Sequence, residues 1–161
     1  MCLIVDANQR DAFFGRPPKP EYAPAVAWIL SDTAGGRLVF GGKLRAELAQ
    51  KQGAFRVLRE WVIAGRAVEY PDDEVAVEER LVLALGIRSD DEHVIALARI
   101  SGARVVATED ADLIADVTNK KLLDKPRGKI YQRAEHEHLL NHSTSCGLPM
   151  TRTVRGRAAR K

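Results

Sequence analysis

The chain has 161 residues, of which 45% are hydrophobic and 29% are charged, and its formal net charge is +3. This length and composition suit one ordinary domain with a hydrophobic core and a short additional segment. No apolar run approaches the ~18 residues that a membrane-spanning helix needs, and no basic segment precedes the short apolar N-terminus. Neither a membrane span nor a signal peptide is therefore expected.

Charge is distributed unevenly along the chain. Residues 1–112 hold 14 Lys and Arg against 18 Asp and Glu, whereas residues 113–161 hold 11 against 4. The basic C-terminal part could follow a phosphate backbone, or it could be only a solubilising tail. Residues 151–161 have the composition of a disordered segment.

The two cysteines, Cys2 and Cys146, lie far apart in the sequence. Cys2 falls in a presumed core strand, so the simplest interpretation is a reduced protein in the cytoplasm.

Strands and helices alternate along the first 117 residues, which is typical of a parallel α/β domain. The apolar run at residues 1–5 reads as a buried parallel strand. The further expected elements are a loop at 10–20, a helix at 21–30, a strand at 37–40, a Gly41–Gly42 turn into a helix carrying Glu47, a helix at 54–64, a strand at 67–70, a helix at 72–85, a helix at 90–101, a strand at 104–108 and a short helix at 113–117. Beyond these, residues 129–132 read as a short edge strand and residues 134–140 as one or two helical turns.

A capping-box pattern marks the start of the helix at 90–101. Ser89 and Glu92 stand at the spacing at which a hydroxyl and a carboxylate each bind a free backbone N–H at a helix start. Gly102 is a suitable C-terminal stop for this helix.

Five carboxylates follow strands or stand near helix starts. Asp6 ends the first strand, Asp110 and Asp112 follow the strand at 104–108, and Glu47 and Asp91 lie close to helix starts. Ligands bind outside the carboxyl ends of the strands in an open parallel sheet, so these acids are expected to converge there. A hard divalent cation that neutralises them is the common physical reason for such a cluster, and it points to metal-assisted phosphodiester chemistry.

The ordered set of these blocks resembles the PIN-domain family of metal-dependent nucleases. The blocks are Val5-Asp6-Ala7-Asn8, Glu47 on an early helix, the run from Asp91 to Ala98, and Thr108-Glu109-Asp110-Ala111-Asp112-Leu113. The resemblance covers about residues 1–117, and toxin ribonucleases of toxin–antitoxin pairs are the nearest group. It implies a three-layer α/β domain, with a central parallel sheet of four to five strands and helices on both faces.

The same resemblance assigns roles to individual residues. It implies Asp6, Glu47, Asp91 and Asp110 as catalytic acids, and Asp6, Asp91, Asp110 and Asp112 as ligands of Mg²⁺ or Mn²⁺. Asn8 and Thr108 match small polar positions that orient a carboxylate or a bound water. In the family's chemistry, hydrolysis of RNA leaves a 5′-phosphate and a 3′-hydroxyl.

The resemblance also implies partners and a division of the chain. The partners are an RNA substrate, an antitoxin protein and a second copy of the chain. The expected division is a PIN-like nuclease domain at residues 1–133, a C-terminal appendage at 134–150 and a basic, disordered tail at 151–161. This extension is longer than in compact toxins of the family, so it weakens the toxin assignment and leaves the nuclease fold unaffected.

Each acid also has a simpler explanation. Asp91 could serve only the helix dipole, Glu47 could be a solvated helix residue, and Asp112 could cap the helix that follows. Asp6 is the hardest to explain in this way, because an acid that closes a buried strand needs a partner. Three other functions stay open. They are a PIN-like module that binds RNA or protein without cutting it, a phosphoaspartyl enzyme that uses Asp6 as nucleophile or phosphoacceptor, and a nuclease that acts on structured DNA.

Seven basic residues are candidates for phosphate contacts: Lys43, Arg45, Lys120, Lys121, Lys125, Arg127 and Lys129. Each could equally be an ordinary exposed charge, although an acidic site needs cations nearby to hold a nucleic-acid backbone. The run of His136, His138, His142 and Cys146 contains zinc-ligand residue types. A solvated polar helix end is the favoured interpretation of that run.

Overall fold

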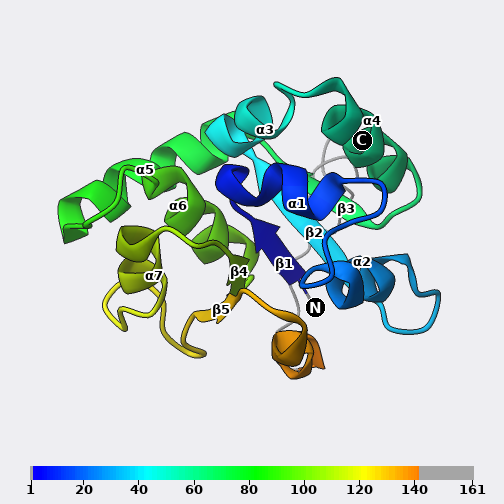
Figure 1. Cartoon of the computed structure of the whole chain (residues 1–161). Helices are drawn as coiled ribbons and strands as arrows, with labels where there is room; N and C mark the ends of the chain where they lie inside the picture. The colour runs from blue at the N-terminus through cyan, green and yellow to red at the C-terminus, as the bar shows by residue number, and fades with distance from the viewer. Residues whose placement is uncertain (1, 142–161) are drawn as a thin grey trace.

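The computed structural model describes residues 2–141 and contains one parallel sheet of five strands (Figure 1). In chain order the strands are β1 (Cys2–Val5), β2 (Arg37–Gly41), β3 (Ala67–Tyr70), β4 (Val105–Ala107) and β5 (Lys129–Tyr131). Their order in the sheet is β3-β2-β1-β4-β5. The α/β class and the parallel sheet expected from the sequence are confirmed. The order reverses between β1 and β4, and this reversal is the position at which open α/β sheets bind ligands.

Helices surround the sheet and connect its strands. They are η1 (Ala7–Gln9), α1 (Arg10–Phe14), α2 (Ala23–Leu30), α3 (Gly42–Leu48), α4 (Gln52–Ile63), α5 (Asp72–Leu85), α6 (Glu92–Ser101), α7 (Ala111–Val117) and η2 (Ala134–Asn141). Figure 1 shows α5, α6 and α7 grouped on one side of the sheet and α2 and α4 on the other. None of the helices within residues 2–141 has the length and apolar character needed to cross a membrane.

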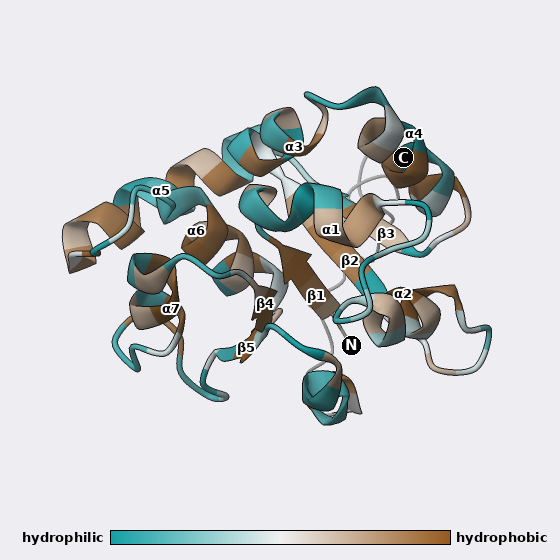
Figure 2. Ribbon diagram, viewed as in Figure 1, coloured by the Kyte–Doolittle hydropathy of each residue, from teal (hydrophilic) through white to brown (hydrophobic). Residues whose placement is uncertain are grey.

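The core is built around the central strands. All four residues of β1 and all three of β4 are buried, as expected for parallel strands that are covered on both faces. The continuous brown colour of β1 in Figure 2 reflects this apolar composition. Helix α6 contributes five consecutive fully buried residues, from Val94 to Ala98. The acids that follow β1 and β4 therefore stand at the edge of a densely packed, apolar region.

The expected loop at residues 10–20 is wrong in its first half, where α1 forms. Phe13 is 1% exposed and packs edge-on against Tyr22 and Trp61, with ring centroids 5.6 and 6.2 Å away. The Tyr22 hydroxyl donates a hydrogen bond to Gln9 Oε1 over 2.8 Å. These aromatic contacts come from distant parts of the chain and stabilise α1. The glycine and prolines from Gly15 onward favour a loop, so the local sequence did not predict this helix.

The expected capping box at the start of α6 is also wrong. Asp91 occupies the N-cap position without a side-chain cap, and the Ser89 hydroxyl donates to Asp116 Oδ2 over 2.6 Å. The Asp116 carboxylate also accepts from the backbone N–H groups of Arg88 and Ser89, both at 2.9 Å. The buried Asp116 carboxylate on α7 accepts three hydrogen bonds, which is more than a local side-chain cap would form. These bonds connect the segment before α6 to α7.

Two glycines allow α3 to begin directly after β2. Gly42 has φ of +58°, and a Cβ there would lie 2.9 Å from Val75 Cγ1. A Cβ on Gly41 would lie 2.5 Å from the Tyr70 carbonyl oxygen. Because only glycine fits both positions, the chain turns from strand to helix without a loop, and Lys43 and Glu47 are brought close to the sheet edge.

Cys2 is disulfide-bonded, which corrects the expectation of a reduced thiol. Residues 142–161 lie outside the described part of the chain, so the tail at 151–161 and most of the appendage at 134–150 cannot be compared with the structure. Within the described residues, η2 packs against α2 and β5, and its Leu140 joins the hydrophobic core.

The Asp116 contacts generate a stability prediction. Replacing Asp116 by Ala should lower the free energy of unfolding by about 2–4 kcal/mol, because it leaves the Ser89 N–H and hydroxyl buried without an acceptor. Urea unfolding measures the change. Asp112→Ala on the same helix removes an exposed carboxylate and should cost no more than about 1 kcal/mol. Equal losses in the two variants would contradict this account.

Candidate functional site

Asp6 stands at the end of β1 and is only 4% exposed. Its backbone N–H donates to the Ala107 carbonyl of β4 over 2.9 Å, which continues the pairing of the two strands beyond the sheet. The Thr108 hydroxyl donates to Asp6 Oδ2 over 2.8 Å. Burial raises the pKa of Asp6, and the charges of Glu47 and Asp110 raise it further, whereas the bond from Thr108 opposes the shift. The carboxylate is held firmly in a position that disfavours its own negative charge.

Asp110 is tied into the chain that follows β4. Its Oδ1 accepts from the backbone N–H groups of Asp112 and Leu113, at 2.9 and 3.1 Å, and so caps α7. Its own N–H donates to Thr108 Oγ1 over 3.1 Å. Thr108 thus links Asp6 and Asp110 through one hydroxyl group. Hydrogen bonds hold one oxygen of Asp110, and hydrogen bonds from Thr108 and the Ala7 backbone hold the Asp6 carboxylate.

Asp91 and Glu47 complete a set of four acids that influence one another. Burial raises the pKa of Asp91 to about 6, and the charges of Asp6 and Asp110 add to the shift. Burial also raises the pKa of Glu47, and the charge of Asp91 contributes. These mutual effects mean that the structure brings acids from four separate segments to one edge of the sheet. The repulsion among them is of the kind that a bound cation relieves.

Two basic side chains accompany the four acids. The charge of Lys43 lowers the pKa of Glu47 and of Asp91, so its ammonium group lies within electrostatic range of both. Arg10 donates from Nη1 to the Glu47 carbonyl over 2.8 Å and also lowers the pKa of the Glu47 carboxyl. The site therefore combines clustered carboxylates with cations at its margin.

The remaining acid and amide predicted for the site, Asp112 and Asn8, have exposed side chains. Asp112 is exposed, and its carboxylate makes no hydrogen bond or ion pair within residues 2–141. Asn8 is exposed on η1, where its Oδ1 accepts a 3.3 Å bond from Gln9 Nε2. Across the part of the chain that is described, no three His, Cys, Asp or Glu side chains are grouped closely enough to hold a metal ion. The four acids lie within electrostatic range of one another, but their carboxylates are not close enough together to bind one metal ion jointly.

Most of the predicted phosphate-binding residues lie elsewhere. Arg45 pairs with Glu69 at 2.5 Å, and its guanidinium carbon is 6.0 Å from the centre of the Phe55 ring. Lys120 and Lys121 line a hollow beyond the C-terminal end of α7. Lys129 starts β5 and is paired with Val105 at the start of β4. Lys125 and Arg127 belong to the loop between α7 and β5, so the group at 120–129 leads to the amino edge of the sheet, opposite the acids.

The described part of the histidine run is engaged in local contacts. His136 Nδ1 accepts from the Gln132 N–H over 2.9 Å, and its ring packs edge-on against Tyr131. His138 Nδ1 lies 2.8 Å from the Glu135 carbonyl. His142 and Cys146 lie outside the described residues, so the zinc hypothesis is not tested.

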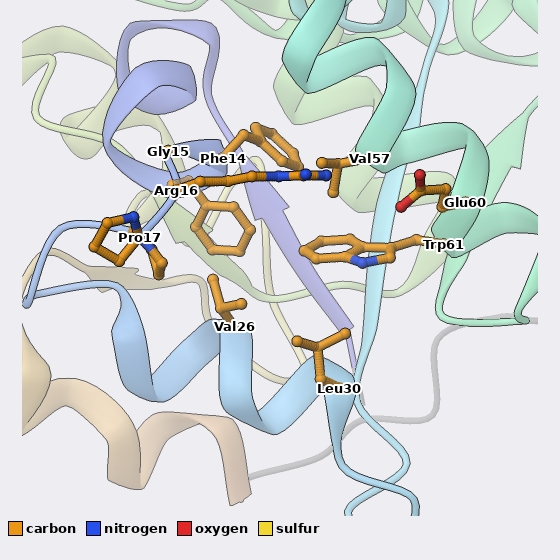
Figure 3. Close-up of a pocket in the computed structure, with 11 residues that line it drawn as sticks. Phe14, Gly15, Arg16, Pro17, Val26, Leu30, Val57, Glu60 and Trp61 are labelled. Atoms are coloured by element: carbon orange, nitrogen blue, oxygen red, sulfur yellow. The ribbon is translucent and has the colours of Figure 1, made fainter.

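A second hollow of about 390 Å³ lies away from the acids, between the end of α1, α2 and α4 (Figure 3). Phe14 and Trp61 face it, and the Arg16 side chain extends across it. Leu30 and Val26 close it from α2. None of the four clustered acids lines this hollow, so it does not belong to their site.

No protein-family model, no curated protein and no solved structure matches the chain. The site must therefore be interpreted from its own residues.

Sequence reasoning missed one residue of the site, Arg10, and gave His93 no role there, since that residue was expected to pack or to face solvent. Arg10 lies four positions after Asp6, but the expected loop gave it no place. His93 is 1% exposed on the first turn of α6, and its Nε2 lies 2.8 Å from Glu47 Oε1. Its position two residues after Asp91 was the only available signal, and that signal does not tell which way the ring points.

The electrostatics of Asp91 generate a pH prediction. Its pKa is raised from 3.8 to about 6, so the folded protein binds this proton more tightly than the unfolded chain does. The contribution of Asp91 to stability should therefore fall as the pH rises from about 4 to about 6. Carbon-13 NMR of the carboxyl groups should give a midpoint near 6 for Asp91, lower in Asp6→Asn and unchanged in Asp112→Asn. A midpoint near 4 in the wild type would contradict the raised pKa, and a midpoint unchanged by Asp6→Asn would show that Asp6 does not act on Asp91.

Proposed function

We propose that this protein is a divalent-metal-dependent nuclease that hydrolyses RNA, with a PIN-like α/β domain. The observation that carries the proposal is the set formed by Asp6, Glu47, Asp91 and Asp110. These acids come from four segments, and charges within the set contribute to the raised pKa of Asp6, Glu47 and Asp91 at the carboxyl edge of the sheet. Such an edge is where α/β sheets bind ligands, and clustered carboxylates are typical of sites for hard cations.

The residues present fit Mg²⁺ or Mn²⁺ in the chemistry of their donors, because all four acids offer oxygen. Asp110 Oδ1 accepts the hydrogen bonds that cap α7, so Asp110 Oδ2 is left for a cation. Asp6 receives hydrogen bonds from Thr108 and from the Ala7 backbone, and an acceptor lone pair remains on its carboxylate. A bound cation of this kind lowers the pKa of a water molecule and stabilises negative charge on a phosphate. Side-chain movement is required, because within the described residues the acids have not converged to ligand distances.

The chain's own residues have distinct tasks in this proposal. Thr108 orients Asp6 through its hydroxyl and keeps the carboxylate from rotating. Lys43 and Arg10 supply positive charge at the margin of the site, where it can hold the phosphate oxygens of a substrate. By the family resemblance, the products are a 5′-phosphate and a 3′-hydroxyl.

The choice of RNA over DNA, an antitoxin partner, a homodimer and a cytoplasmic location also rest on the family resemblance or on composition. They form part of the proposal without support from a particular contact. Two rival functions give different results in the experiment below. A binding module would bind Mn²⁺ without cutting, and a phosphoaspartyl enzyme would form a hydroxylamine-labile adduct on Asp6.

The test is cleavage of labelled single-stranded RNA and DNA with Mg²⁺, Mn²⁺ or EDTA. The wild type should cut RNA only when metal is present. Asp6→Asn and Asp110→Asn should reduce cutting to the level of the EDTA control, because each removes a charged donor. Asn is itself a good N-cap, so Asp110→Asn should keep α7 intact.

Asp112→Asn serves as the matched control, since its carboxylate is exposed and unattached. It should retain most of the cleavage. Undiminished cleavage in both Asp6→Asn and Asp110→Asn would overturn the site. Mn²⁺ binding by the wild type without any cleavage would favour the binding module.

A further inference from the structure

His93 is a buried imidazole directed at one of the clustered acids. It is 1% exposed, and its Nε2 lies 2.8 Å from Glu47 Oε1. The angles are not those of a formed hydrogen bond, so both ring nitrogens and Oε1 are buried without a hydrogen-bond partner within the described residues. The separation of 2.8 Å is within hydrogen-bond range, and a small rotation of either side chain would align an Nε2–H with Oε1.

Packing alone does not explain a histidine at this position. The next five residues of α6, from Val94 to Ala98, are all apolar and fully buried. An apolar residue at position 93 would fit the same environment without placing two polar nitrogens out of water. The Nε2–H group of the ring is the donor that can satisfy Glu47 Oε1.

We propose that His93 is a positioning residue for Glu47: its Nε2–H holds Oε1 and so directs Oε2 toward the clustered acids. The inference rests on the proposed function in so far as Glu47 serves a cation there. Glu47 lies on α3 and its side chain is 27% exposed, so it has more freedom than buried Asp6. A contact from α6 restricts that freedom.

A similar arrangement occurs at two of the other acids, Asp6 and Asp110. Thr108 holds one oxygen of Asp6, and the first N–H groups of α7 hold one oxygen of Asp110. His93 completes the pattern for Glu47. Groups that orient metal-binding carboxylates in this way affect metal affinity without touching the metal.

The contact can be tested in the metal-free protein by nitrogen-15 NMR of the histidine rings. We expect His93 to carry its proton on Nε2, with a slowly exchanging N–H that is lost in Glu47→Ala and kept in Asp112→Asn. A proton on Nδ1, or a His93 signal unchanged by Glu47→Ala, would overturn the inference. Since no metal or substrate is involved, this result does not depend on whether the protein is a nuclease.

The consequence for the site can be tested through the affinity for Mn²⁺, measured by electron paramagnetic resonance. His93→Leu should weaken binding about 10- to 100-fold. His93→Gln places an N–H close to the position of Nε2 and should restore the affinity to within about threefold. In a Glu47→Ala background, His93→Leu should change the affinity less than about twofold, because its effect passes through Glu47.

Ser101→Ala is the structural control, since it removes a buried hydroxyl at the far end of the same helix. It should leave Mn²⁺ affinity unchanged, and thermal unfolding should show that all the variants fold. An equal loss from His93→Leu with and without Glu47 would overturn the positioning role. A wild type that binds no Mn²⁺ would instead overturn the proposed function, and the NMR result would still decide the contact.

Discussion

The structure depends on one constraint at the carboxyl edge of the sheet: a nearly buried carboxylate, Asp6, must be kept ionisable among other acids. A parallel sheet brings the ends of β1 and β4 to the same edge, so the residues after both strands are forced together. Burying a charge without a partner is costly. The Thr108 hydroxyl reduces that cost for Asp6, but the neighbouring carboxylates increase it. The clustered, partly buried acids at this edge lower the stability of the folded protein, and acids with perturbed pKa values are commonly found at functional sites.

The surrounding helices act mainly to position side chains at this edge. The two glycines after β2 start α3 at once, which brings Lys43 and Glu47 near the strand ends. Buried α6 presents Asp91 at its N-terminus and His93 within its first turn. The N-terminus of α7 is capped by Asp110 itself, so one carboxylate serves both the helix and the site. Stability and the proposed chemistry share the same hydrogen bonds.

Local patterns sufficed for the sheet and for most helices, since buried parallel strands are continuous apolar runs and amphipathic helices have their own spacing. Asp6 and Asp110 could be placed in the same way, because acids that closely follow two buried parallel strands must lie at the carboxyl edge of the sheet. The sequence did not reveal α1, which depends on aromatic contacts with Tyr22 and Trp61. Nor did it reveal the role of Ser89, where a distant carboxylate replaced the expected cap. The direction of His93 and the distant position of the 120–129 basic group depend on tertiary packing, which no local pattern encodes.

The hydrogen bonds of the Asp116 carboxylate have a consequence for the acidic edge. The carboxylate accepts hydrogen bonds from the backbone N–H groups of Arg88 and Ser89. The Ser89 hydroxyl in turn accepts a hydrogen bond from the Asp91 N–H over 3.3 Å. Asp110 begins the helix on which Asp116 sits. The start of α6 and α7 thus form one hydrogen-bonded unit that carries both Asp91 and Asp110. A substitution at Asp116 would therefore disturb the spacing of two acids of the site from the opposite end of α7.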